Sequence, residues 1–165
     1  MISEAVVRGA RESDLKAILA IYNQGIEDRI ATLETEIKDS SYMKEWFKHH
    51  KDRFSVVVAE EGRNIIGWAS LNPYNNRSAY NGVADISVYI SRESRGKGVG
   101  GKLLSTLEAK ARENNFHKLV LFTFPFNGLG QGLYKKMGFR EVGIFQNQGV
   151  LDGKFVDVMA MEKLL

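Results

Sequence analysis

The spacing of apolar residues along the chain predicts an alternation of strands and amphipathic helices. Apolar positions three and four residues apart, from Leu15 to Ile26 and again after Gly101, indicate helices that bury one face. Short continuous apolar runs indicate buried strands. The predicted strands are residues 5–7, 54–59, 65–71, 83–90, 119–124, 139–145 and 155–161, and the predicted helices cover about residues 14–26, 42–47, 102–114 and 131–137, the first with Ser13 as its N-cap.

This order of elements, β-α-α-β-β-β-α-β-α-β-β, predicts an α/β protein with a mixed sheet and helices on its faces. The length of 165 residues suits one domain that spans residues 1–165. A hydrophobic content of 44% and a charged content of 26% are ordinary for a globular protein. Neither a repeat nor a linker divides the chain.

Composition then removes several classes of function. The absence of cysteine excludes a disulfide, a thiolate metal site and a cysteine nucleophile. The three histidines have no metal-ligand spacing, so no metal is expected. The net charge of +3 is too small to indicate nucleic acid, and an anionic small molecule is a sufficient partner. Glu4, Arg8 and Arg11 stand where a secretory signal needs apolar residues, and no apolar run is long enough for a membrane, so we expect a cytoplasmic protein.

Residues 95–102, Arg-Gly-Lys-Gly-Val-Gly-Gly-Lys, are the most informative segment of the chain. They join the predicted strand 83–90 to an amphipathic helix, which presents backbone N–H groups and the positive end of a helix dipole to an anion. Arg92, Lys97 and Lys102 would add positive charge around it. The segment therefore predicts a phosphate-binding loop.

Two common phosphate-loop patterns match these glycines but lack their second element. The loop fits G-x-G-x-x-G, yet the next strand, residues 119–124, ends without the acidic residue that holds a ribose. It also fits G-x-x-x-x-G-K through Lys102, yet Leu103 stands where a Ser or Thr would hold magnesium. A dinucleotide and ATP are both disfavoured as ligands.

A third pattern, Arg-x-x-Gly-x-Gly, is met by Arg95, Gly98 and Gly100. It resembles the acetyl-CoA pyrophosphate loop of the GCN5-related N-acetyltransferase (GNAT) superfamily. The family's later Asn, Tyr and Gly-Phe are matched by Asn127, Tyr134, Gly138 and Phe139. The resemblance covers nearly the whole chain, and it implies the GNAT fold, a central and mostly antiparallel sheet flanked by helices.

A closer resemblance is to the phosphinothricin acetyltransferase branch of that superfamily. The matching segments are Ile21-Tyr22-Asn23, Thr35-Glu36, Arg77-Ser78-Ala79-Tyr80, Ala84-Asp85 followed by Tyr89, and Lys154-Phe155 followed by Asp157-Val158. The branch implies acetyl-CoA as donor, the α-amine of a small amino acid or analogue such as phosphinothricin or methionine sulfoximine as acceptor, and a homodimer. Acetylation of a polyamine, an aminoglycoside or a protein N-terminus stays an alternative, as does a non-catalytic module that senses acetyl-CoA.

The resemblance also implies which residues bind ligands, and a chain without cysteine suits direct transfer in a ternary complex. The residues expected at acetyl-CoA are Val88, Tyr89, Ile90, Arg95, Gly96, Lys97, Gly98, Val99, Gly100, Gly101 and Asn127. Those expected at the acceptor are Arg77, Tyr80, Tyr74 and Thr32. The alternative for Asn127 is a helix N-cap, and the alternative for the acceptor residues is an exposed loop.

Two residues are candidates for proton transfer. Asp85 is an acid within an apolar strand, which is costly unless the group is paired or its pKa is raised. The branch has Glu at this place, so action through a water, or substrate positioning alone, stays open beside direct proton abstraction. Tyr134 matches the family's general-acid tyrosine, and its phenol could protonate a leaving thiolate. The alternative for Tyr134 is a core aromatic residue.

Overall fold

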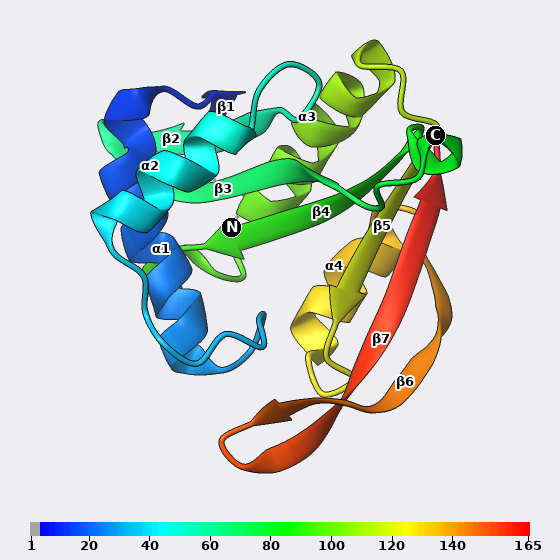
Figure 1. Cartoon of the computed structure of the whole chain (residues 1–165). Helices are drawn as coiled ribbons and strands as arrows, with labels where there is room; N and C mark the ends of the chain where they lie inside the picture. Colours follow the sequence, from blue (N-terminus) through cyan, green and yellow to red (C-terminus); the bar gives the residue numbers. More distant parts are fainter. Residues whose placement is uncertain (1–3) are drawn as a thin grey trace.

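The computed structural model describes residues 4–165, so the first three residues of the predicted domain lie outside the described range. The elements are β1 (Val6–Gly9), α1 (Leu15–Asp28), α2 (Ser40–His49), β2 (Val56–Glu61), β3 (Asn64–Pro73), β4 (Val83–Ile90), α3 (Val99–Glu113), β5 (Lys118–Thr123), α4 (Gly128–Lys136), β6 (Arg140–Leu151) and β7 (Lys154–Leu164). Short 3-10 turns η1 (Glu12–Asp14), η2 (Ser78–Tyr80) and η3 (Arg92–Ser94) separate some of them. The predicted order of strands and longer helices is confirmed (Figure 1).

Some predicted boundaries are wrong for identifiable reasons. Asp14, not Ser13, precedes the first turn of α1, because its carboxylate accepts the Arg11 N–H at 2.8 Å and pairs with Arg8 at 2.8 Å in the η1 turn. Helix α4 begins at Gly128, three residues before the predicted start. The closing strands β6 and β7 are 12 and 11 residues long, because they stay paired as a twisted hairpin beyond the apolar runs that marked them.

The seven strands form one sheet in the order β1-β2-β3-β4-β5-β7-β6. Every neighbouring pair is antiparallel except β4 and β5, which are parallel. This confirms a mixed and mostly antiparallel sheet. A parallel pair needs a crossover, and α3 supplies it.

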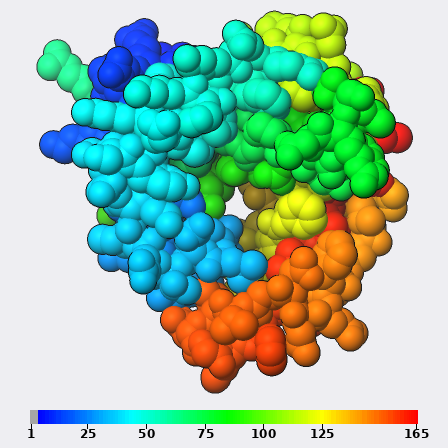
Figure 2. All heavy atoms as spheres, viewed as in Figure 1, coloured from blue at the N-terminus to red at the C-terminus, as the bar shows by residue number. Residues whose placement is uncertain are grey.

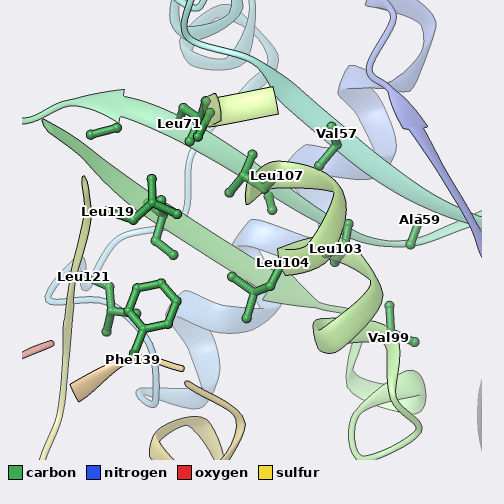
Figure 3. Packing of buried hydrophobic residues seen from close by; sticks show 14 of the residues in the cluster. Val57, Ala59, Leu71, Val99, Leu103, Leu104, Leu107, Leu119, Leu121 and Phe139 are labelled. Atoms are coloured by element: carbon green, nitrogen blue, oxygen red, sulfur yellow. The ribbon is translucent and has the colours of Figure 1, made fainter. Parts of the chain in front are cut away.

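Helices cover both faces of the sheet, each over its own core (Figure 1). On one face α3 buries Leu103, Leu104 and Leu107 against β2, β3 and β4 (Figure 3). Burying each of these leucines contributes about 1.5–3 kcal/mol to folding. On the other face α1 and α2 pack Ile18, Met43 and their neighbours around Trp68. Within residues 4–165 no helix has the length and hydropathy to span a bilayer.

The parallel pair positions the cavity. Strands β4 and β5 pair only from Val83 to Asp85, whose partner is Val120. Beyond this point β4 continues beside β3 while β5 continues beside β7, so the two strands diverge. The β6–β7 hairpin then reaches back toward the segment after α1, where Arg29 pairs with Asp152 at 2.9 Å. These segments border the hollow that Figure 2 shows at the centre of the molecule.

Candidate active site

A cavity of about 440 Å³ lies between the end of β4, the N-terminus of α3 and the start of α4. A second cavity of about 160 Å³ adjoins it between β4 and β5 and contains Asp85. Ala31, Val88, Tyr89, Asn127 and Tyr134 line both cavities. The opening between the diverging strands therefore connects the glycine loop to the candidate base.

The glycine loop ends in a helix start that faces the larger cavity. Gly96 and Gly98 have φ angles of 76° and 84°, in the left-handed region that favours glycine. Gly98 is the N-cap of α3 and has no side chain to accept from the N–H groups of the first turn. Those N–H groups and the positive end of the helix dipole suit an anionic ligand. Among the predicted donor-site residues, only Lys97 does not line this cavity.

The cationic side chains of the loop are engaged elsewhere. Arg92 pairs with Asp28 at 2.9 Å, and Arg95 pairs with the same carboxylate at 2.7 Å. The pKa of the Asp28 carboxyl is lowered. The hydrogen bond from Arg92 is the largest cause, burial acts in the opposite direction, and the hydrogen bond from Arg95 adds to the lowering. Lys102 donates to the Ala5 carbonyl at 3.1 Å. Arg92 and Lys102, which the sequence places near a phosphate, thus hold the loop against α1 and against Ala5, the residue before β1.

The outer half of β4 presents a backbone edge to the cavity. Residues 88–90 pair with β3 on one side, whereas their other side lies beyond the last pair that β4 makes with β5. Val88, Tyr89 and Ile90 all line the larger cavity. An edge of this kind offers N–H and C=O groups to an extended ligand, as in the addition of a strand to a sheet.

Asp85 lies in the smaller cavity, half-buried on β4. Burial raises the pKa of its carboxyl to about 6, and a hydrogen bond from Asn72 at 3.2 Å and one from the Ile86 N–H oppose that rise. A carboxylate with a pKa of about 6 is ionised at neutral pH and is basic enough to accept a proton. The free-energy cost that the sequence predicts for burying an acid in this strand therefore appears as a raised pKa of the Asp85 carboxyl.

Tyr134 faces the same place from α4. It is half-buried, lines both cavities and packs edge-on against Phe139, with ring centroids 5.9 Å apart. Burial, followed by the negative charge of Asp85, raises the pKa of its phenol to about 12. The phenol therefore keeps its proton at neutral pH. Tyr134 is both a wall of the core and a proton-bearing group in the cavity.

Asn127 is the N-cap of α4, which was the alternative for this residue. Its side-chain oxygen accepts the Gly130 N–H at 3.1 Å, and its amide lies 3.4 Å from the Thr123 hydroxyl. It lines both cavities while doing so. Capping fixes where the start of α4 stands relative to the cavity.

The predicted acceptor residues are not gathered in one place. Arg77, Tyr74 and Tyr80 are exposed in the segment between β3 and β4, where the two tyrosine rings meet edge-on, and none of them lines either cavity. Thr32 is closer to the site. Burial raises the pKa of Tyr89, and a hydrogen bond with Thr32 partly offsets that rise.

Sequence reasoning missed the polar residues around Asp85. Asn72 donates to Asp85 and, at 3.0 Å, to Ser87, while His50 contacts the Asn72 oxygen at 2.8 Å. The signal was present, since Ser70 and Asn72 are two residues apart in an otherwise apolar strand and must share one face. His50 is the C-cap of α2, and it is half-buried, with its Nε2 2.8 Å from the Asn72 oxygen.

The Acetyltransferase (GNAT) family model matches residues 18–139 of this chain. That range includes the glycine loop, β4 and Tyr134. The chain belongs to this acetyltransferase family. It is an N-acetyltransferase, with the fold that the family implies.

Relatives and solved structures extend this assignment over the whole chain. YwnH of Bacillus subtilis (strain 168) is 36% identical over 160 residues, which cover 96% of this chain and 98% of that protein. The L-methionine sulfoximine/L-methionine sulfone acetyltransferase of Pseudomonas aeruginosa is 29% identical over 96% of this chain and 93% of its own.

Among solved structures, a GNAT superfamily phosphinothricin acetyltransferase from Sinorhizobium meliloti, in complex with acetyl-CoA, has a TM-score of 0.92 and 29% identity. The match covers 98% of this chain and 88% of that one. A ribosomal-protein-alanine N-acetyltransferase from Brucella melitensis has a TM-score of 0.94 and 32% identity, over 97% of this chain and 99% of its own. Proteins with nearly the same fold are therefore named for different acceptors.

Proposed function

We propose that this protein transfers an acetyl group from acetyl-CoA to the α-amine of a small amino acid or analogue, by direct attack in a ternary complex. One observation carries the proposal. The carboxylate of Asp85 and the phenol of Tyr134 face one opening, which adjoins a glycine loop at a helix N-terminus. The names of the Pseudomonas and Sinorhizobium proteins support the choice of donor and acceptor.

The end of the cavity beside the glycine loop, here called the donor end, fits acetyl-CoA by its shape and by its hydrogen-bond donors. A Cβ at Gly96 would meet no atom within 4 Å, so the space beside this residue is open. The N–H groups at the start of α3 would hold the pyrophosphate. The edge of Val88–Ile90 would pair with the pantetheine arm, and an N–H there would polarise the thioester carbonyl. When bound, acetyl-CoA supplies an activated acetyl group.

Asp85 acts on the acceptor amine. Its carboxylate accepts the proton that the ammonium form of the acceptor loses, either directly or through one water molecule, and the free amine then attacks the thioester carbonyl. The pKa of about 6 means that most of Asp85 is ionised at neutral pH. Without such a base the attacking amine would keep its proton and lack a lone pair.

Tyr134 acts on the leaving group. Its pKa of about 12 is well above the value of about 8.5 for an ordinary thiol, so full transfer of the phenol proton to a thiolate is unfavourable. Tyr134 therefore keeps its proton and donates a hydrogen bond toward the leaving sulfur. The same donor position helps to stabilise the charge that develops there.

A thiol-release assay tests the function. Purified protein with acetyl-CoA should release free thiol when phosphinothricin or methionine sulfoximine is added, and mass spectrometry should detect the N-acetylated product. Release with neither these nor other amino acids would refute the proposed acceptor class. Binding of acetyl-CoA in a thermal-shift titration, without turnover of any amine, would favour the sensing module instead.

A second candidate acceptor is the N-terminus of a protein. The Brucella structure favours it, since its name gives a ribosomal protein as substrate. A short peptide with an N-terminal alanine, used in the same assay, separates the two candidate acceptors. Only a site with room for the residues that follow the alanine can accept it. A higher kcat/KM for the peptide than for any free amino acid would replace the first proposal with this one.

We also propose that the protein is a homodimer and works in the cytoplasm. The β6–β7 hairpin supports a self-association surface, because it leaves large apolar side chains in solvent. They are Val142, Ile144, Val150 and Phe155, between 47% and 69% exposed. Light scattering should give twice the chain mass of 18.6 kDa, and Phe155→Lys should reduce it. A wild-type mass of one chain would contradict the dimer, and cell fractionation checks the location.

A further inference from the structure

Strand β4 presents a row of polar side chains along one face. Asp85, Ser87 and Tyr89 alternate with apolar residues and therefore share that face. All three line the smaller cavity. The sheet register sets Asn72 of β3 directly opposite Asp85, and Ser70 stands opposite Ser87. The proposed function uses Asp85 and gives no role to the serine beside it.

The Asn72 amide links Asp85 to Ser87. Nδ2 of Asn72 lies 3.2 Å from Oδ2 of Asp85 and 3.0 Å from the Ser87 hydroxyl oxygen. An ionised carboxylate only accepts hydrogen bonds, so the NH₂ group of Asn72 faces Asp85. Its two hydrogens serve the carboxylate and the hydroxyl, one each. The Ser70 hydroxyl donates to Oδ1 of Asn72 at 2.9 Å and holds the amide in this orientation.

The Ser87 hydroxyl keeps a hydrogen that it can donate into the cavity. A hydroxyl has one hydrogen to donate and accepts through its oxygen. The Ser87 oxygen accepts from Asn72, so the hydroxyl hydrogen must point elsewhere. Within residues 4–165 the Ser87 side chain makes no other hydrogen bond, and it is half-buried in the cavity wall. A donor in this position suits an acceptor atom of a bound ligand.

We infer that Ser87 is a substrate-binding residue that donates a hydrogen bond to the carbonyl or carboxylate oxygen beside the acceptor amine. The inference rests on the proposed role of Asp85, which takes the amine of the same molecule. Asn72 is the positioning residue for both groups, since one nitrogen atom holds the carboxylate and the hydroxyl. The two groups are close enough together for the amine and the carboxylate of one amino acid to contact both.

This arrangement distinguishes between classes of acceptor. An α-amino acid and a protein N-terminus both have an oxygen on the carbon that follows the amine-bearing carbon. The terminal amine of a polyamine has no such oxygen and would leave the Ser87 hydroxyl without a partner. Across the cavity, Leu121 and Phe122 of β5 have no hydrogen-bond donor in their side chains, so they cannot bind that oxygen in its place.

Isothermal titration calorimetry tests the inference without turnover. Protein saturated with CoA, which has no acetyl group to transfer, is titrated with L-methionine sulfone or with methylsulfonylpropylamine, the same molecule without its carboxylate. The wild type should bind the sulfone about tenfold more tightly than the amine. Ser87→Ala should lose most of this preference and keep its affinity for the amine. Ser87→Thr retains a hydroxyl and should restore the preference.

Asn72→Leu tests the positioning role. Its loss of the donor to Asp85 affects both probes, because both have the amine, and so cancels in the ratio of their dissociation constants. The ratio should still fall by about threefold, because the Ser87 hydroxyl is no longer held. Adding Asn72→Leu to Ser87→Ala should not change the ratio further, since Asn72 acts on it through Ser87. Ser41→Ala, an exposed serine on α2, is the matched control and should keep the wild-type ratio.

Two results would overturn the inference. One is a wild-type protein that binds the two probes equally or binds neither. The other is a ratio in Ser87→Ala equal to that of the wild type. Thiol release from acetyl-CoA judges the proposed function separately. Turnover of amines with equal ratios would refute the role of Ser87 alone, whereas a ratio that depends on Ser87, without turnover of any amine, would refute acetyl transfer and leave the binding site intact.

Discussion

The two ends of the cavity are built by different means. The donor end is made mainly of backbone, from the continuous loop at residues 95–101 and the exposed edge of β4. The acceptor end is made of side chains from α2, β3, β4 and α4 that are far apart in the sequence. We therefore expect donor binding to depend on backbone geometry and proton transfer to depend on individual side chains.

From this comparison we expect substitutions at the two ends of the cavity to affect different kinetic parameters, KM for acetyl-CoA at one end and kcat at the other. Acceptor-end substitutions should lower kcat or shift its pH dependence. Donor-end substitutions should change KM for acetyl-CoA and leave the pH dependence alone.

The largest effect is expected for Asp85→Asn. Loss of a general base costs about 10²–10⁴-fold, so kcat/KM for the amine should fall by at least about 100-fold. In the wild type kcat/KM should rise with pH through about 6 and then level off, and the variant should lose this limb. Steady-state assays from pH 5 to 9 measure both. Glu93→Gln, an exposed carboxylate near the loop, is the control and should keep wild-type kinetics.

The same substitution should raise stability at neutral pH. The folded-state pKa of Asp85, about 6, is above the value of about 3.9 for an unfolded chain, so the native state holds its proton more tightly. Stability is therefore lost as the pH rises from about 4 to about 6, and the whole loss of roughly 2–3 kcal/mol is present above pH 6. Urea unfolding should show Asp85→Asn gaining this amount over the wild type between pH 4 and pH 7. An equal difference at both pH values would contradict the raised pKa.

Tyr134→Phe should have a smaller effect. It removes a hydrogen-bond donor but keeps the ring that packs on Phe139, so kcat should fall about tenfold with KM for acetyl-CoA nearly unchanged. Because the phenol pKa is about 12, the wild-type rate should show no basic limb from Tyr134 below pH 10. Tyr42→Phe, on the exposed side of α2, serves as control. Equal kcat in wild type and Tyr134→Phe would assign Tyr134 to the core alone.

The smallest effect is expected at the donor end, from Gly96→Ala. At a φ of 76° a side chain costs about 1–2 kcal/mol of strain, although the added methyl group meets no atom within 4 Å. Gly62→Ala is a matched control, with a φ of 65° and the same open space, in the β2–β3 turn. Both should lose similar stability on thermal unfolding, and only Gly96→Ala should raise KM for acetyl-CoA, by about tenfold or less. The same KM in both variants would remove the loop from the donor site.

The sequence predicted more of the fold and of the donor end than of the acceptor end. The strand and helix order follows from apolar periodicity, which is local, and the glycine loop is continuous, so both can be recognised without tertiary contacts. Arg95 shows the limit of such reasoning, since its guanidinium pairs with Asp28 of α1 at 2.7 Å, a partner that the sequence does not indicate. Which partner a charged side chain selects depends on what folding brings within a few ångströms of it.

The order of elements, the glycines before α3 and the acid in the middle of β4 can be recognised from the sequence, because each is a property of neighbouring residues. What surrounds that acid depends on contacts between elements far apart in the sequence. The register of β3 on β4 sets Asn72 opposite Asp85, and the docking of α2 on the sheet brings His50 to Asn72. Burial then raises the pKa of Asp85, because desolvation depends on atoms contributed by the whole fold.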